Sequence, residues 1–139
     1  MKKIENYLYE EEMQAIRSAC SEVWKNFGGA FKESIIDNAL TIALEKQGLK
    51  VESQKRIDIY FEGKKVGTYV PDKIVNNVIL IELKCKPRLL QEDKKQFWYY
   101  LKASPYKVGL LINFGPKKLE ICRRIYDKAR HEKAQANKA

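Results

Sequence analysis

The sequence has little of what soft metal sites and disulfide frameworks require. Its 139 residues include three cysteines, Cys20, Cys85 and Cys122, and one histidine, His131. The cysteines are odd in number and widely spaced, whereas a disulfide framework usually has an even count and a zinc site has closely spaced pairs. The sequence therefore argues strongly against a zinc site and a histidine-based catalytic triad, and any metal is expected to be a hard cation on oxygen ligands.

Long hydrophobic runs are also missing. Apolar runs such as Val78–Ile81 are far shorter than the ~20 residues that cross a membrane. The segment 1–12 is too acidic for a secretion or transit signal, so we expect a cytoplasmic protein. A hydrophobic fraction of 45% and a charged fraction of 32% are typical of a globular protein. We expect one domain over 1–139, with a core at about 28–125 and a basic tail at 126–139.

Acidic residues are scarce in the second part of the chain. Residues 1–83 carry 12 basic and 13 acidic side chains, whereas residues 84–139 carry 15 basic and 5 acidic ones. This asymmetry predicts a polyanionic partner, of which nucleic acid is the commonest. A basic surface that only keeps the protein in solution is the alternative, above all for residues 128–139.

Hydrophobic periodicity predicts the order of helices and strands. Apolar residues at steps of three and four predict two helices before residue 50, each ending at a glycine. Short β-branched runs separated by Glu62-Gly63 and Asn76-Asn77 predict strands, with an interruption near Pro71. The expected helices are 8–27, 30–47 and 91–103, and the expected strands are 51–61, 65–75, 78–85, 108–114 and 119–125. This order predicts an α/β fold, a mixed central sheet flanked by helices.

Charged side chains end an otherwise apolar strand. Strand side chains alternate, so Glu82 and Lys84 share a face while Leu83 points the other way. Charges at such a position are costly unless they are paired or bind a metal. A two-residue turn in the preceding hairpin would put Asp72 on the wrong face. We therefore predict an odd-length turn or a bulge, which places Asp72 opposite Glu82.

A third carboxylate lies in the second predicted helix. Glu33 is three residues before Ile36 and seven before Leu40, so it is expected on the inward stripe of that helix. The alternative is an ordinary first-turn carboxylate that the helix dipole favours. Beside Asp72 and Glu82, we favour a functional carboxylate.

The helix after Pro87 supplies two further candidates. Gln96 and Tyr100 are four residues apart and therefore share a helix face. They are candidates for positioning a phosphate or the Lys84 ammonium. Nearby aromatic side chains could stack on bases, although core packing explains Phe97 better.

Taken together, these blocks resemble a known group of enzymes. Pro71-Asp72 followed by Glu82-Leu83-Lys84 resembles the motif of the PD-(D/E)XK nuclease superfamily. The downstream Gln96-x-x-x-Tyr100 resembles the QxxxY motif of recombination helicase-nucleases. The order of five blocks more closely resembles the GxxExxY family within that superfamily, with Ile36 where the family has its second named residue, tyrosine. The matching blocks are 28–34, 67–72, 82–84, 96–103 and 108–115.

The resemblance implies a restriction-endonuclease-like core that hydrolyses phosphodiester bonds in nucleic acid. Asp72, Glu82 and the carbonyl of Leu83 would bind Mg²⁺, with Mn²⁺ as a substitute. Lys84 would position the attacking water or stabilise charge on the phosphate. Glu33 would hold a metal-bound water or a second ion.

Other residues implied by the same resemblance would hold the substrate. Gln96, with Tyr100, would hold the reacting phosphate or orient the catalytic lysine. Basic side chains that flank the motif would contact the phosphate backbone and carry affinity without sequence preference. These residues are Lys86, Arg88, Lys94, Lys95 and Lys102.

The expected activity is that of a metal-dependent deoxyribonuclease in DNA repair or recombination. A Holliday-junction resolvase-like enzyme is one alternative. A non-catalytic module that binds nucleic acid or a protein partner is a second, because this fold also has non-enzymatic members. An ordinary ion pair between Glu82 and Lys84 at a strand edge is a third. A domain of this size would grip a duplex more easily as a homodimer.

Overall fold

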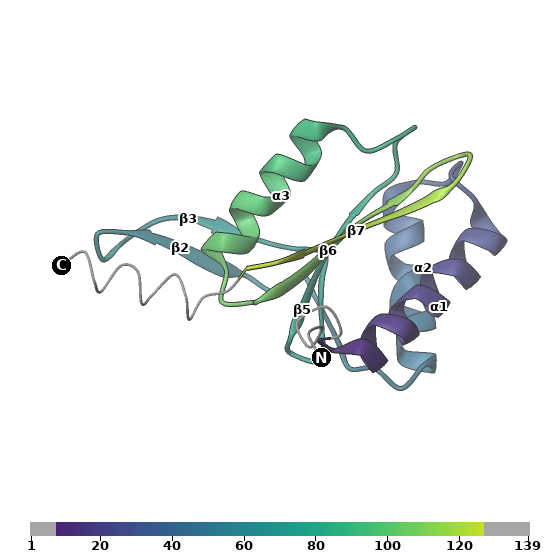
Figure 1. The fold of residues 1–139 in the computed structure, drawn as a ribbon, viewed down its shortest axis with the longest axis horizontal. Helices are drawn as coiled ribbons and strands as arrows, with labels where there is room; N and C mark the ends of the chain where they lie inside the picture. Colours follow the sequence, from purple (N-terminus) through teal and green to yellow (C-terminus); the bar gives the residue numbers. More distant parts are fainter. Residues whose placement is uncertain (1–7, 127–139) are drawn as a thin grey trace, which may run out of the picture.

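The computed structural model describes residues 8–126, which form three helices and seven strands (Figure 1). The predicted helices and most predicted strands are found within a few residues of their expected bounds. In chain order the elements are α1 (Glu10–Phe27), α2 (Glu33–Lys46), β1 (Val51–Ser53), β2 (Ile57–Phe61), β3 (Lys64–Tyr69), β4 (Lys73–Val75), β5 (Ile79–Lys84), α3 (Gln91–Ala103), β6 (Val108–Phe114) and β7 (Leu119–Ile125).

Five of the strands form one mixed sheet in the order β1-β4-β5-β6-β7. The central pair β5 and β6 is parallel, and every other neighbouring pair in this sheet is antiparallel. The remaining strands, β2 and β3, form a separate antiparallel hairpin. The predicted fold class, a mixed sheet flanked by helices, is confirmed.

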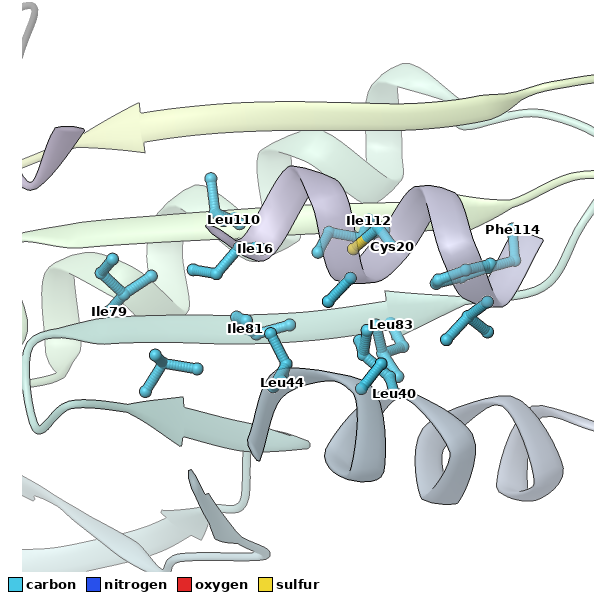
Figure 2. Packing of buried hydrophobic residues seen from close by; sticks show 14 of the residues in the cluster. Ile16, Cys20, Leu40, Leu44, Ile79, Ile81, Leu83, Leu110, Ile112 and Phe114 are labelled. Atoms are coloured by element: carbon cyan, nitrogen blue, oxygen red, sulfur yellow. The ribbon is translucent and has the colours of Figure 1, made fainter. Parts of the chain in front are cut away.

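Helices cover both faces of the sheet, α1 and α2 on one face and α3 on the other (Figure 1). Figure 2 shows the first interface, where Ile79, Ile81 and Leu83 of β5 pack among side chains of α1 and α2. Leu80 points the other way and packs with Phe97 and other residues of a second cluster. Because β5 and β6 are covered on both faces, their sequences are almost continuously apolar.

The expected single strand 51–61 was wrong. The structure has two strands there, and β1 belongs to the main sheet whereas β2 pairs only with β3. The intervening residues 54–56 are polar and exposed, and Gln54 has a φ of 57°, which turns the chain out of the sheet. The predicted interruption near Pro71 is confirmed, since β3 ends before it and β4 begins after it.

The hairpin β4–β5 has the predicted odd-length turn. Val75 pairs with Ile79, so three residues form the loop, and Asn76 and Asn77 both have positive φ, at 51° and 60°. Asparagine tolerates this left-handed conformation better than most residues. The pairing of Lys73 with Ile81 then continues to put Asp72 opposite Glu82. None of the helices within residues 8–126 is long and apolar enough to cross a membrane.

Candidate active site

Asp72 and Glu82 meet where β4 begins and β5 approaches its end. Oδ2 of Asp72 accepts a hydrogen bond of 2.7 Å from the backbone N–H of Leu83. The N–H and C=O of one strand residue point to the same side, so the carbonyl of Leu83 also faces the side of Asp72. Two carboxylates and one backbone carbonyl therefore border the same end of the sheet.

Tyr69 is a site residue that the motif analysis did not single out. Its hydroxyl donates a hydrogen bond of 3.1 Å to Oε1 of Glu82. Its ring stacks on Tyr100 with centroids 4.2 Å apart, so the predicted Tyr100 reaches the carboxylate only through this neighbour. The spacing Gly67-x-Tyr69-x-x-Asp72 was the available signal, because it already formed part of the family resemblance.

Negative charge accumulates at this end of the sheet. Burial and, next, the charge of Asp72 raise the pKa of Glu82 to about 7. Burial also raises the pKa of Asp72, although the Leu83 hydrogen bond opposes the rise. Burial raises the pKa of the nearby Cys85 thiol to about 11, and Glu33 and Asp72 add to the rise.

Lys84 is the cation that these carboxylates share. Its charge acts on Glu33, Asp72 and Glu82, in each case lowering the pKa against the effect of burial. The four predicted residues therefore lie within electrostatic reach of one another. Lys84 does not neutralise the site, since the pKa values of all three carboxyl groups stay above their ordinary values.

Glu33 is not on the inward face, and this expectation was wrong. It is exposed, whereas Ile36 and Leu40 of the same stripe are fully buried. Glu33 is the first residue of α2, and helical side chains tilt toward the N-terminus, so its side chain extends beyond the helix. Partial loss of hydration and, next, the charge of Asp72 still raise its pKa, which places its carboxyl group at the edge of the site.

The donor set fits a hard cation that keeps some of its water. Within residues 8–126 no group of three or more histidine, cysteine, aspartate or glutamate side chains is arranged to hold a metal. Mg²⁺ needs no such cage, because one or two carboxylates with waters and substrate phosphate suffice. Asp72 and Glu82, with the Leu83 carbonyl, are the residues that could hold it, and burial raises the pKa of both carboxyl groups in the absence of a cation.

Replacing Glu82 with glutamine is expected to stabilise the protein at pH 8 in chelator. The folded protein keeps the Glu82 proton up to about pH 7, whereas the unfolded chain releases it near pH ~4.3. The contribution of Glu82 to stability is therefore lost as pH rises through that window. Glutamine stays neutral and still accepts from Tyr69. We expect the free energy of unfolding to rise by about 1–3 kcal/mol at pH 8 and by less at pH 5.

Urea denaturation at both pH values measures this difference. Glu45→Gln, an exposed carboxylate on α2, is the matched control and should change stability little at either pH. Equal effects of Glu82→Gln at pH 5 and pH 8 would show that the Glu82 carboxylate is not destabilised by its surroundings.

A buried ion pair lies beside the carboxylates and was missed by sequence reasoning. Lys73 is fully buried and pairs with Asp37 of α2, and its ammonium also donates to the Asp37 carbonyl at 3.2 Å. This pair joins α2, which begins at Glu33, to β4, which begins directly after Asp72. Asp37 lies one helical turn after Glu33, so the pair fixes one site element against the other.

Asp37→Asn is expected to lower the free energy of unfolding by about 2–3 kcal/mol, because it leaves the buried Lys73 ammonium without a counter-charge. The double variant Asp37→Asn/Lys73→Met should recover most of this loss, since an apolar side chain of similar volume needs no partner. Thermal and urea unfolding measure both values. A single variant as stable as the parent would show that the pair does not hold these elements together.

A polar cluster holds the segment that follows Lys84. The amide of Asn113, which is fully buried, accepts from the backbone N–H of Lys86 at 3.0 Å and donates to its carbonyl at 2.9 Å. It also donates to Glu120, whose carboxylate accepts from the backbone of Leu89 at 3.0 Å. The end of β5 is thereby fixed to β6 and β7, which keeps Lys84 in place.

The other predicted substrate residues lie along α3 and the loop before it. Gln96 is exposed and lines a groove of about 450 Å³ with Tyr100, Lys95 and Ile59. Phe97 is buried, as expected of a core residue. The structure brings Gln96 and Tyr100 to one groove, and their contact with a phosphate stays a prediction.

The predicted basic residues differ in their surroundings. Lys86 forms an ion pair with Asp93 at 2.8 Å, so its charge is already compensated. Arg88 is exposed, and Lys94 and Lys95 line a second groove with Trp98. The Lys102 ammonium lies 5.7 Å from the Trp98 ring and 5.0 Å from the Tyr99 ring. The basic tail and His131 lie outside the described residues.

Comparisons with known proteins bear on the fold and the superfamily of the chain. The chain is similar in fold to the crystal structure of SSO0001, with a TM-score of 0.53 and 22% identity over 70% of this chain. It spans 52% of the SSO0001 chain, and at this identity the likeness shows the fold alone. No curated protein matches the chain. The family model described as the PD-(D/E)XK nuclease superfamily matches residues 10–125, and the chain therefore belongs to that superfamily.

Proposed function

We propose that the protein is a Mg²⁺-dependent nuclease that hydrolyses phosphodiester bonds, with DNA as its substrate. The observation that carries this proposal is the convergence of two carboxylates, Asp72 and Glu82, with the ammonium of Lys84 at one end of the sheet. Burial disfavours the charged forms of both carboxylates, and the charge of Asp72 adds to this effect on Glu82, so a bound cation would stabilise the ionised groups. Superfamily membership supports nuclease chemistry at such a site.

Each residue has a role that follows from its place. Asp72 is held by the Leu83 N–H through one oxygen, which leaves its other oxygen available to a cation. Tyr69 fixes one oxygen of Glu82 and thereby orients that carboxylate. Lys84 is a point charge beside both, suited to stabilising the negative charge that develops on the phosphate or to positioning the attacking water. Glu33, at the edge, would accept a hydrogen bond from that water.

The proposed cation is Mg²⁺, with Mn²⁺ as a substitute, held by Asp72, Glu82 and the Leu83 carbonyl. When bound, it would lower the pKa of a water, orient the phosphate and neutralise developing charge. Gln96 would hold the reacting phosphate from α3. Arg88, Lys94 and Lys95 would contact the phosphate backbone, with affinity that falls as salt rises.

The proposal also covers the family, the cellular role, the location and the oligomeric state of the protein. The order of motif blocks supports membership of the GxxExxY family, and a role in repair or recombination follows from that resemblance. The acidic segment 1–12 supports a cytoplasmic location. A homodimer would give a domain of this size enough contact with a duplex. Cleavage of branched DNA would support the alternative of a Holliday-junction resolvase-like enzyme.

A substrate panel tests the proposal. Purified protein is incubated with circular, linear, single-stranded and branched DNA and with RNA, in Mg²⁺, Mn²⁺ or chelator. We expect metal-dependent cleavage of at least one DNA substrate and none in chelator. Binding without cleavage of any substrate would contradict the nuclease and favour the alternative below.

The alternative is a non-catalytic module that binds nucleic acid or a protein partner. Ile36 favours it, because it stands where the family has a tyrosine, and it is fully buried in the core. That position therefore supplies packing and no hydroxyl group. Magnesium binding without turnover would support this alternative.

A further inference from the structure

The β2–β3 hairpin is a feature that the candidate site does not use. It is separate from the five-stranded sheet, lies beside α3 and projects from the body of the protein (Figure 1). Glu62 and Gly63 close it with φ values of 50° and 77°, and Phe61 pairs directly with Lys64. Positive φ at both loop residues is typical of a type I′ turn, whose twist matches that of the strands. The two-residue loop at the tip therefore has a regular turn conformation.

Large apolar side chains gather at this tip without cover from the described residues. Tyr60, Phe61 and Val66 are 61%, 66% and 63% exposed. The register shifts between Ile59 and Tyr60, which leaves Val66 unpaired in a β-bulge. Bulges of this kind increase local twist and redirect side chains. Tyr60 and Phe61 are consecutive residues of β2, so their rings lie on opposite faces of the hairpin, and each face near the tip presents an exposed aromatic ring.

The base of the hairpin is fixed to the candidate site. Ile57 and Tyr69 are buried in the core cluster beneath α3, and the Tyr69 hydroxyl donates to Glu82 at 3.1 Å. At ~3.3 Å per residue, the length of β3 separates the tip from Tyr69 by about 17 Å. A strand of duplex DNA rises ~3.4 Å per nucleotide, so about five base pairs of duplex span the distance from a phosphate at the site to the tip.

The charge of the hairpin fits a polyanion. Residues 55–69 carry four basic side chains, Lys55, Arg56, Lys64 and Lys65, and two acidic ones, Asp58 and Glu62. Lys65 approaches Asp58 at 3.3 Å, which offsets one of the acidic charges. A second copy of this net-positive hairpin would repel the first. Basic side chains interleaved with exposed aromatic rings are the combination that binds unpaired bases by stacking.

We propose that the hairpin tip binds unpaired bases, with Tyr60 and Phe61 as stacking surfaces and Lys64 as a phosphate contact. The inference rests on the proposed nuclease and names its substrate class: nucleic acid with a single-stranded segment about five nucleotides from the reacting phosphate. A fork, flap or gap has this character, and a blunt duplex does not.

Fluorescence anisotropy in chelator tests the proposal without requiring cleavage. Fluorescein-labelled forked DNA and a blunt duplex of the same sequence are titrated with the parent, with Tyr60→Ala/Phe61→Ala and with Ile42→Ala. Ile42 is 68% exposed on α2 and serves as the matched control. We expect the double variant to bind the fork about 10-fold or more weakly than the parent, with little change for the duplex. The control should match the parent on both.

Three results would overturn the inference. They are an unchanged affinity for the fork, an equal loss on fork and duplex, and a change of oligomeric state in the double variant by light scattering, which would make the tip a contact between copies. Thermal unfolding checks that the double variant is folded. Hairpin-dependent binding of the fork without metal-dependent cleavage would contradict only the nuclease, whereas cleavage with hairpin-independent binding would contradict only this inference.

Discussion

Lys84→Ala is expected to lower the rate of metal-dependent cleavage by about 100- to 1,000-fold, the cost of removing one group that stabilises transition-state charge. Lys84 is the cation that acts on Glu33, Asp72 and Glu82, whereas the nearby Lys73 is buried and paired with Asp37. Affinity for DNA should change little, because binding depends on many other basic groups. Single-turnover cleavage and anisotropy measure the two quantities separately.

Lys46→Ala is the matched control for this experiment. Lys46 is an exposed lysine on α2 that pairs with Glu22 at 3.1 Å, away from the proposed site. The Lys46→Ala variant should cleave DNA at the rate of the parent. If Lys84→Ala cleaved as fast as Lys46→Ala, Lys84 would have no role in the reaction and the nuclease assignment would lose its main residue.

Asp72→Asn is expected to abolish the heat of Mg²⁺ binding and to lower cleavage by about 1,000-fold, since a metal contributes several kcal/mol to such reactions. Asparagine has the same shape and its oxygen can still accept from the Leu83 N–H, so the fold should persist. Loss of this charge should also lower the pKa of Glu82, because the Asp72 charge is the second cause of its rise.

Isothermal titration and the pH dependence of unfolding measure these effects. Asp58→Asn, a partly exposed aspartate on the β2–β3 hairpin, provides the control and should bind Mg²⁺ as the parent does. A variant at Asp72 that kept the parental heat of binding would place the metal elsewhere.

The part of the fold that follows residue 78 could be predicted closely from the sequence. The helix 91–103 and the strands 108–114 and 119–125 have the bounds that periodicity and turn residues predict. The register of Asp72 against Glu82 could also be predicted, because only an odd-length turn brings the two carboxylates to one face. Periodicity and turn residues were sufficient to predict element bounds and hairpin register where elements that are consecutive in the sequence pack together.

Longer-range features were beyond the same reasoning. Residues 51–61 have one continuous strand pattern, and nothing local shows that β1 and β2 belong to different sheets. The pairing of Lys73 with Asp37 joins residues 36 positions apart, so no local spacing shows it. Glu33 matched the inward stripe of its helix, but the pattern does not show that the helix begins there.

Crystallography with Mn²⁺ in place of Mg²⁺ tests the central claim most directly, because the anomalous signal locates the ion. We expect one peak in contact with the carboxylates of Asp72 and Glu82 and the carbonyl of Leu83, at about 2.0–2.2 Å from their oxygens. No peak there at saturating Mn²⁺, or a peak only at other residues, would contradict a metal-dependent site at this end of the sheet.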